Sequence, residues 1–403
     1  MTRLRNGSTA AIGFAVAGQV ADAGAYSGVP GALMRALADL GVRVLPLQAE
    51  LPRPLQRTAL NMLAVLLTRL EDVPSEGSAV ERVRLGVRGN KPRVHAGPAM
   101  AALRSSAVRA RLLGHGEVAM CVQFGSEYRL PARIRYVTYD DATVAQLSRE
   151  YDYPWMAAVP ANELQRMIGR QARIFSRAHR CCVTNHWAAD SATADYGVPR
   201  ERIIVTGQGA EPRPAGSDAR DWSTPRFLFV GKDWQRKNGH QVLRAFAHVR
   251  AQRPDARLDV VGGHPRLDAP GVTGHGLLSQ SDPVAQARLD DLFSSATCFV
   301  MPSLLEPSAC VFAEALQAGI PSIGGTAGGS STIVGDAGRM VDGRDERAVT
   351  AAMLELCDEH ALASCAAAAR ARAPLFTWRA VGERVLRALA PPGLDVAEFA
   401  AGL

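Results

Sequence analysis

The feature that most constrains this fold is a regular alternation between short apolar runs and longer helical patterns along the chain. The alternation begins at Ala10, stops at the proline-rich, polar stretch 211–225 (EPRPAGSDARDWSTP), and then starts again. Short apolar runs that alternate with helices are typical of parallel α/β sheets, and a polar stretch without periodicity is typical of a linker. The sequence therefore predicts two α/β units joined by a connector.

The same alternation predicts the elements of each unit. In the first half we expect strands over residues 9–16, 42–47, 117–123, 134–139, 181–184 and 202–206, and helices over 28–41, 57–70, 97–113, 161–177 and from Trp187 onward. In the second half we expect strands over 226–231, 257–263, 297–302 and 320–325, and helices over 239–252, 283–295, 309–318, 345–359 and 378–390.

The length of 403 residues suits two hydrophobic cores rather than one. We place a first domain at residues 1–210, a connector at 211–225 and a second domain at 226–377, with a C-terminal helix and tail at 378–403 that cross back to the first domain. Because open α/β sheets bind ligands outside the carboxyl ends of their strands, we expect the site in a cleft between the two domains.

The charge of the chain favours a phosphorylated ligand or an anionic surface, since 46 lysines and arginines against 39 acidic residues give a net charge of +7. A genome that prefers arginine codons is an alternative source of this excess. No basic run is interleaved with aromatic residues, so we expect no nucleic-acid partner. The seven cysteines form no C-x-x-C pair, which is typical of a reduced, cytoplasmic protein.

Two segments bear on membranes. Arg3 and Arg5 before TAAIGFAVAGQVADAGA could begin a signal peptide, but the same residues continue into a strand–loop–helix unit, which is the interpretation we prefer. Helix 57–70, which has several arginines in and beside it, is expected in the core, with an anionic membrane surface as the alternative. No run of about 18 apolar residues exists, so no segment is expected to span a membrane. We therefore expect a cytoplasmic location and leave peripheral contact with the inner face of the membrane open.

The segment FVMPSLLEPSACVFAEALQAGIPSIGG carries two glutamates, Glu306 and Glu314. Glu306 follows an apolar strand and precedes a helix, and Glu314 lies about one and a half turns inside that helix. Two carboxylates so placed could contact two hydroxyl-bearing parts of one extended ligand, while free N–H groups at the helix start could bind phosphate. The alternative is a capped helix with one exposed glutamate.

Residues on both sides of this segment favour the ligand interpretation. Upstream, in FLFVGKDWQRKNGHQVLRAF, Lys232, Arg236 and Lys237 lie in a turn between a strand and a helix, where they could neutralise a diphosphate. A solvated basic loop is the alternative for this turn taken alone. Downstream, four glycines between residues 324 and 329 would let the backbone approach a ligand closely.

Taken in order, these pieces resemble family 4 of the retaining glycosyltransferases, whose GT-B fold has two Rossmann-like parallel-sheet domains facing across a cleft. The resemblance rests on G-K and N-G around the basic turn, on D-V-V-G-G, and on V-M-P-S-L-L-E-P-S followed by E-A-L-Q-A-G-I-P. It covers residues 225–390 well and extends weakly into the first half, at Y-S-G-V-P (26–30) and at W-A-A-D followed by D-Y-G-V (187–198).

The resemblance implies a role for each piece. It implies that Glu306 binds the hydroxyls of the donor sugar and that Glu314 binds the ribose diol. Lys232 and Lys237 would bind the diphosphate. The helix start would add backbone N–H groups, the 26–30 loop would close over the phosphates from the first domain, and the strand around His275 would meet the base. The implied donor-binding residues are Gly28, Val29, Lys232, Lys237, His275, Glu306, Ser308, Ala309, Cys310, Val311 and Glu314. The implied catalytic residues are Glu306, Lys237, Lys232 and Asp140.

The chain departs from the family's pattern in both halves. Many members carry a histidine after the strand that we expect at 134–139, where this chain has Asp140 and Asp141. Adjacent residues at a strand end point to opposite sides, so at most one of the two faces a ligand. The family also commonly has arginine where Lys232 stands, which keeps the charge. The aspartate bears on the identity of the sugar more than on the reaction class.

The resemblance implies that a sugar passes from a nucleoside diphosphate sugar to a hydroxyl acceptor with retention of configuration. A glycan, a glycolipid or a small molecule would serve as acceptor, and cell-envelope polysaccharide or glycolipid synthesis is the family-level expectation. No histidines have metal-ligand spacing such as H-E-x-x-H, so we expect no metal and no cofactor beyond the nucleotide sugar. No side chain stands out as a nucleophile, which favours a front-face mechanism.

Three alternatives stay open at this stage. The first is another GT-B enzyme, such as a nucleotide-sugar epimerase or a phosphorylase. The second is a non-catalytic protein that binds nucleotide sugars. The third, a dinucleotide-dependent oxidoreductase, is disfavoured because no G-x-G-x-x-G follows the first strand.

Overall fold

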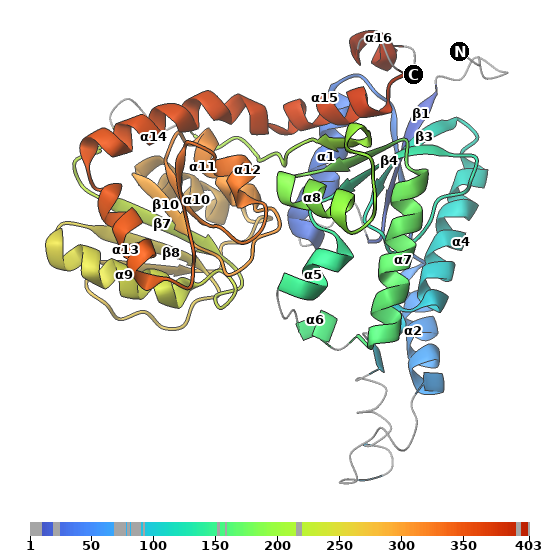
Figure 1. The fold of residues 1–403 in the computed structure, drawn as a ribbon, viewed down its shortest axis with the longest axis horizontal. Helices are drawn as coiled ribbons and strands as arrows, with labels where there is room; N and C mark the ends of the chain where they lie inside the picture. Colours follow the sequence, from blue (N-terminus) through green and yellow to red (C-terminus); the bar gives the residue numbers. More distant parts are fainter. Residues whose placement is uncertain are drawn as a thin grey trace. The chain divides into compact units, whose positions relative to one another are not determined.

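Two six-stranded sheets of parallel strands form the frame of the chain in the computed structural model (Figure 1). The structure describes residues 10–18, 25–67, 78, 81, 90–91, 93–150, 154–157, 159–214, 220–391 and 396–401. The chain divides into two units. The first comprises Met1–Cys182, Asp190–Ile204 and Val385–Leu403, and the second comprises Val183–Ala189 and Val205–Arg384.

The first sheet has the strand order β2-β1-β3-β4-β5-β6. Its strands are β1 (Ala11–Val16), β2 (Val44–Gln48), β3 (Val118–Phe124), β4 (Arg135–Asp140), β5 (Arg180–Val183) and β6 (Ile203–Val205). Its helices are α1 (Val29–Asp39), α2 (Arg53–Leu67), α4 (Pro98–Gly114), α5 (Val144–Glu150), α6 (Pro154–Ala157), α7 (Ala161–Arg177) and α8 (His186–Ala194), with short 3₁₀ turns at Ala25–Gly28 and Arg200–Arg202. β1 is buried along its whole length, as strands of parallel sheets are.

The second sheet has the strand order β12-β11-β10-β7-β8-β9. Its strands are β7 (Arg226–Gly231), β8 (Arg257–Gly262), β9 (Val272–Gly276), β10 (Cys298–Met301), β11 (Ser322–Gly325) and β12 (Gly338–Val341). The helices that follow are α9 (Gly239–Gln252), α10 (Pro283–Ser295), α11 (Cys310–Gln317), α12 (Ser330–Val334), α13 (Glu346–Glu355), α14 (Glu359–Arg372), α15 (Trp378–Leu389) and α16 (Val396–Ala401), with a 3₁₀ turn at Ala373–Phe376.

Both sheets contain a point at which the strand order reverses. β1 lies between β2 and β3 in the first sheet, and β7 lies between β8 and β10 in the second. Ligands of open α/β sheets bind at the carboxyl ends of the strands beside such a reversal. The fold therefore points to the turns after β1 and β3 in the first unit, and to the turns after β7 and β10 in the second.

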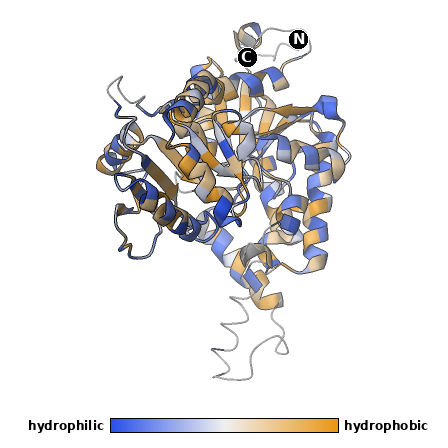
Figure 2. Cartoon of the chain, turned by 60° about the vertical axis from the view of Figure 1, so that its left-hand side comes forward, coloured by the Kyte–Doolittle hydropathy of each residue, from blue (hydrophilic) through white to orange (hydrophobic). Residues whose placement is uncertain are grey.

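Aromatic side chains join the layers of the second unit. α9 and α13 pack together on one face of the sheet, and α10 and α11 lie on the other (Figure 1). Phe246 of α9 meets Phe227 of β7 with ring centroids 6.3 Å apart, and Phe312 of α11 meets Phe299 of β10 at 5.3 Å. Figure 2 shows the matching pattern, with apolar strands inside and hydrophilic residues along the outer sides of the helices.

The predicted α/β elements are confirmed, and their ends need small corrections. The strands expected in the first half shift by at most two residues, and the helix expected at 57–70 begins four residues earlier, at Arg53, with 68–70 outside the described residues. The sequence analysis did not find α14. Asp358 accepts hydrogen bonds from the backbone of His360 and Ala361, so it caps a new helix where we expected the helix over 345–359 to end.

The connector is more ordered than its composition suggests, although residues 215–219 lie outside the described part of the chain. Arg220 donates hydrogen bonds to the carbonyl oxygens of Phe293, Ser294 and Ala318, and its guanidinium lies 4.9 Å from the centre of the Trp222 ring. The part of the connector that the structure describes is thus bound to the second unit. Within the described residues, no helix is long and apolar enough to cross a membrane.

Candidate functional site

The turn after β7 holds Lys237 in a fixed place. Asn238 adopts a left-handed conformation (φ 65°) as the residue before α9, and its side-chain amide donates to the carbonyl oxygens of Pro302 at 3.1 Å and Gly343 at 2.6 Å. Gly231, the last residue of β7, lies so close to Lys237 that a Cβ there would come within 2.9 Å of the lysine's Cγ. The turn therefore needs a glycine behind Lys237 to bring this side chain over the strand end.

The loop after β10 holds Glu306, which is only 4% exposed. Its backbone N–H donates to the carbonyl oxygen of Ala327 at 3.1 Å, and its own carbonyl oxygen accepts from the N–H of Gly329 at 2.8 Å. Gly328 has a positive φ of 102°, and a Cβ at that position would come within 2.2 Å of the Glu306 carbonyl oxygen. Of the four glycines between residues 324 and 329, Gly328 and Gly329 thus contact the backbone of Glu306 and clamp it, while the expected approach of these glycines to a ligand stays a prediction.

Two cations share the Glu306 carboxylate. Arg236 Nη1 lies 3.2 Å from Glu306 Oε2 and also donates to the carbonyl oxygen of Leu305 at 2.9 Å. The ammonium of Lys237 binds the same carboxylate oxygen. Burial lowers the pKa of Lys237, and the nearby Glu306 opposes that shift. Arg236 also pairs with the exposed Asp233 at 3.4 Å, so these two cations and two carboxylates balance, and the neighbouring Lys232 makes the turn positive overall, which suits a bound anion.

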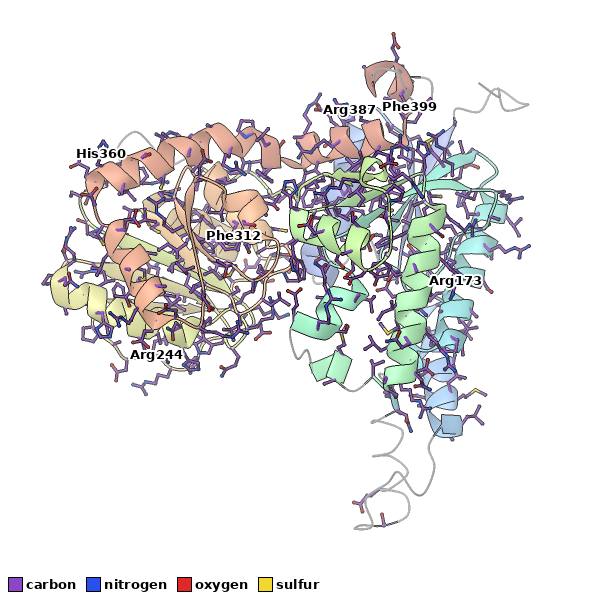
Figure 3. The ribbon with its side chains drawn as sticks, in the orientation of Figure 1. Arg173, Arg244, Phe312, His360, Arg387 and Phe399 are labelled. Carbon is purple, nitrogen blue, oxygen red and sulfur yellow. The ribbon has the colours of Figure 1, made fainter. Side chains whose placement is uncertain are left out.

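The start of α11 lies beside this cluster in the sequence. Ala309 precedes the helix and offers no side-chain cap to the first backbone N–H groups of the helix. The hydroxyl oxygen of Ser308 is buried, and it has no hydrogen-bond partner within the described residues. Phe312, labelled in Figure 3, is fully buried and fixes the helix on the sheet. The expected helix start is confirmed, one residue later than predicted, at Cys310.

The other residues expected around the donor differ in exposure. Lys232 is exposed at the end of β7. The Cys310 thiol accepts a hydrogen bond from Gln208 at 2.6 Å, and burial raises its pKa to about 12. Val311 is half-buried in the first turn of α11. His275 lies in β9, where its Nε2 is 2.7 Å from Asp259 Oδ1. Its expected contact with a base stays a prediction, and Asp259 already occupies one ring nitrogen.

Glu314 has a partner that the sequence analysis missed. Its carboxylate lies 3.4 Å from the guanidinium of Arg213, which comes from the connector. Burial raises the pKa of Glu314, and Arg213 opposes the shift. No motif surrounds Arg213, and its connector looks like a solvated linker, so only the fold reveals that it reaches α11.

The first unit holds the remaining predicted residues, Gly28, Val29 and Asp140. Gly28 has a φ of 75° and precedes α1, so the turn requires a residue that tolerates the left-handed region. Val29 is buried as the first residue of α1. These two residues follow β1 at the reversal of the first sheet. Their expected role at the phosphates stays a prediction.

Asp140 is the last residue of β4 and is 8% exposed. Its Oδ2 has no hydrogen-bond partner within the described residues. Burial raises its pKa to about 8, with Thr138 lowering it and the neighbouring Asp141 and Glu127 raising it further. Asp141 is exposed, so the two adjacent aspartates differ in environment as their places at a strand end predict.

Comparison with known proteins identifies relatives over part of the chain. Residues 224–359 match the family described as glycosyl transferases group 1. A D-inositol 3-phosphate glycosyltransferase of Thermobispora bispora is 31% identical over 216 residues, which are 47% of this chain and 50% of that protein. A GDP-mannose-dependent alpha-(1-6)-phosphatidylinositol monomannoside mannosyltransferase of Mycolicibacterium smegmatis is 30% identical over 172 residues, 38% of this chain and 44% of that protein. The chain thus spans about half the length of the curated relatives it matches.

Solved structures extend the likeness to both units. Sucrose-phosphate synthase from Thermosynechococcus elongatus superposes with a TM-score of 0.60 at 18% identity, over 93% of this chain and 96% of that one. The Anabaena protein Alr3699/HepE, solved with UDP and glucose, superposes with a TM-score of 0.58 at 13% identity, over 94% and 98%. At these identities the likeness shows the fold. The expected GT-B fold with two units is confirmed, and residues 224–359 match the glycosyl transferases group 1, as the resemblance implied for this part of the chain.

Proposed function

We propose that this protein transfers a sugar from a nucleoside diphosphate sugar to a hydroxyl group of an acceptor, with retention of configuration. The observation that carries the proposal is the pair of cations, Arg236 and Lys237, that surrounds Glu306. This cluster follows β7 and β10, the strands beside the reversal of the second sheet, where ligands of such sheets bind. Partial relatives named as glycosyltransferases support the same reaction class.

The donor diphosphate would bind to the cations of this turn. An ammonium has three N–H donors, so Lys237 can bind Glu306 and still offer donors to a phosphate. The exposed Lys232 and backbone N–H groups at the start of α11, which has no side-chain cap from Ala309, would add to this binding. Each charge-assisted hydrogen bond contributes about 1.5–3 kcal/mol. These groups can neutralise the leaving diphosphate without a metal ion, so the proposal includes no metal and no cofactor.

The two glutamates would hold the two ends of the donor. Glu306, between the cations, would accept hydrogen bonds from hydroxyls of the sugar. Glu314, farther along α11, would accept them from the ribose diol. The turn around His275 would meet the base.

In the proposed step, the bond between the anomeric carbon and the diphosphate oxygen breaks, and the acceptor oxygen bonds to the same face of that carbon. The proton of the acceptor hydroxyl passes to the departing phosphate. Burial raises the pKa of the Cys310 thiol to about 12, which makes it a poor nucleophile at neutral pH. This supports the front-face route.

A panel of nucleotide sugars tests the proposal. The true donor should raise the melting temperature of the protein, because a ligand that binds only the folded state stabilises it. Incubation with that donor should then release the nucleoside diphosphate while the sugar is transferred or hydrolysed. A rearranged nucleotide sugar without released diphosphate would support an epimerase, and binding without any turnover would support a non-catalytic protein.

The surface of α2 supports a second part of the proposal, peripheral contact with the inner face of a membrane. Leu55, Met62 and Leu66 are exposed and recur at spacings of seven and four residues, which places them on one face of the helix. Ala64, on another side, is buried against Val94. A helix with a second, exposed apolar face is typical of interfacial helices. A lipid-linked hydroxyl acceptor in the cytoplasm would be reached there, although a soluble glycan or small molecule fits the same chemistry.

A further inference from the structure

Glu314 is a largely buried carboxylate, with one cation beside it. Its side chain is 15% exposed, and Arg213 is its ion-pair partner among the residues that the structure describes. The other charged groups that act on it, Asp290 and Glu211, are acidic and favour its neutral form. Removing the partner of a buried charge leaves that charge uncompensated. The charge of Glu314 therefore depends on Arg213.

Arg213 is itself held from three directions. Its side chain is 8% exposed, and its Nη1 lies 2.7 Å from Asp290 Oδ1. Both terminal nitrogens lie 3.3 Å from Gln286 Oε1, and the guanidinium lies 5.5 Å from the centre of the Phe293 ring. All three partners belong to α10. The guanidinium is thus held against α10, and its second terminal nitrogen, Nη2, faces Glu314.

We propose that Arg213 is a positioning residue for the nucleotide, which keeps Glu314 charged and oriented so that its carboxylate can accept hydrogen bonds from both hydroxyls of a ribose. The inference rests on the proposed function, in which Glu314 accepts hydrogen bonds from the ribose diol. It adds that a connector residue, and not a residue of the sheet edge, sets the strength of that contact.

The planar shape of the arginine side chain suits this role. A guanidinium is planar, offers several donors in a fixed fork, and stacks on aromatic rings. Arg213 uses each of these properties, since one nitrogen serves Asp290, the other serves Glu314, and the plane lies near Phe293. A lysine would supply the charge without the fork, so Arg213→Lys should only partly replace it.

A purely structural role for Arg213 is the competing interpretation, in which the residue merely fastens the connector to α10. The variant Asp290→Asn distinguishes the two interpretations. Asp290→Asn weakens the contact between Arg213 and α10 and leaves the pair of Arg213 with Glu314 in place. A fastening role makes this variant resemble Arg213→Gln, whereas a positioning role does not.

The test compares three ligands: the nucleoside diphosphate that stabilises the wild type most, its 2′-deoxy form, and inorganic pyrophosphate. Calorimetry on the full chain should show that the wild type prefers the ribose form by on the order of tenfold or more, as expected for lost hydrogen bonds to a charged group. Arg213→Gln and Glu314→Gln should lose this preference and bind pyrophosphate as before. Asp290→Asn should keep it, and Arg213→Lys should show an intermediate preference.

The pH dependence gives a readout that a fastening role would not move. Arg213, Asp290, Glu211 and Cys310 are the titratable groups that face Glu314. Without Arg213 the pKa of Glu314 should rise further, so in Arg213→Gln the ribose preference should return as the pH is raised. A preference in Arg213→Gln equal to that of the wild type, or an equal loss of pyrophosphate binding, would overturn the inference. If Arg213→Gln does not fold, Arg213→Lys is measured in its place, and a ribose preference equal to that of the wild type would likewise overturn the inference. A wild type that binds no nucleoside diphosphate would instead refute the proposed function.

Discussion

Glu306 lies at the centre of a cluster of ion pairs in the second unit. Its carboxylate binds Arg236 and Lys237 at once, and a glycine clamp holds its backbone. A buried charge that loses one partner is left partly uncompensated. Substitutions among these three residues should therefore affect anion binding and stability together, and conservative changes separate the two effects best.

Replacing Lys237 with Met removes the ammonium and keeps most of the apolar stem. Binding of the nucleoside diphosphate should weaken by about 10- to 100-fold, the equivalent of one charge-assisted hydrogen bond, while binding of the bare nucleoside should change much less. Calorimetry with both ligands measures the difference. Arg244→Met, which removes an exposed cation of α9 (Figure 3) that pairs with Glu346, is the matched control. Equal losses for nucleoside and nucleoside diphosphate would place Lys237 away from the phosphates.

Asp140 gives a pH dependence of stability. Its pKa is about 8 in the folded chain, against an ordinary value of 3.8, so between about pH 4 and pH 8 the folded state holds a proton that the unfolded state has released. The free energy of unfolding should therefore fall as the pH rises through this window, by up to about 1.4 kcal/mol per pH unit from this one group. Asp140→Asn cannot titrate, so its stability relative to the wild type should improve from pH 5 to pH 8. Urea unfolding at both pH values measures this, and parallel curves would contradict it.

At the scale of elements, the turns after β7 and β10 depend on backbone that approaches backbone. Gly328→Ala would combine a positive φ with a Cβ 2.2 Å from the Glu306 carbonyl oxygen. Collisions of this kind typically cost about 1–3 kcal/mol. Gly197→Ala is the control, because Gly197 also has a positive φ but nothing lies within 4 Å of the added Cβ. Gly328→Ala should lose more stability than Gly197→Ala in urea unfolding, and turnover as well. Equal stability losses in the two variants would show that the clamp is not tight.

The elements differ in how far the sequence predicts them. Strands such as β7 are predictable because a parallel strand buried on both faces needs an unbroken apolar run, which RFLFVG supplies. The division between α13 and α14 turns on one capping residue, Asp358, whose effect competes with the helical propensity of the alanines around it. Contacts made by single long side chains are harder still. Arg213 contacts α10 and α11 only because the chain folds back, and no local sequence pattern predicts these contacts.

At the scale of the whole molecule, the sequence predicts the architecture better than the ligand. Alternating elements and one connector are enough to predict two parallel α/β units, because connection rules allow few other arrangements. The motifs also place Glu306 and Lys237 at strand ends beside a reversal. These motifs do not identify the base or the sugar, and longer-range features such as the pairing of His275 with Asp259 and the burial of Asp140 emerge only in the folded chain.

The exposed face of α2 leads to a prediction about location. Replacing Leu55, Met62 and Leu66 with Ser should reduce binding to vesicles of anionic lipid, since each change removes apolar area that would enter the interface. Flotation of wild type and triple variant with such vesicles measures this. Leu113→Ser, at an exposed leucine of α4, is the control for a general loss of apolar surface. Equal flotation of the wild type and the triple variant would show that α2 does not contact the membrane.

The central claim is that Glu306, held between two cations, serves the transfer of a sugar from a nucleotide donor. The most direct measurement is the turnover of Glu306→Gln with the donor found in the panel, scored by released nucleoside diphosphate and by the sugar product. We predict a fall in kcat on the order of 10²-fold, as for the loss of one preorganised transition-state contact, with binding of the nucleoside diphosphate retained. Turnover near that of the wild type would contradict the claim.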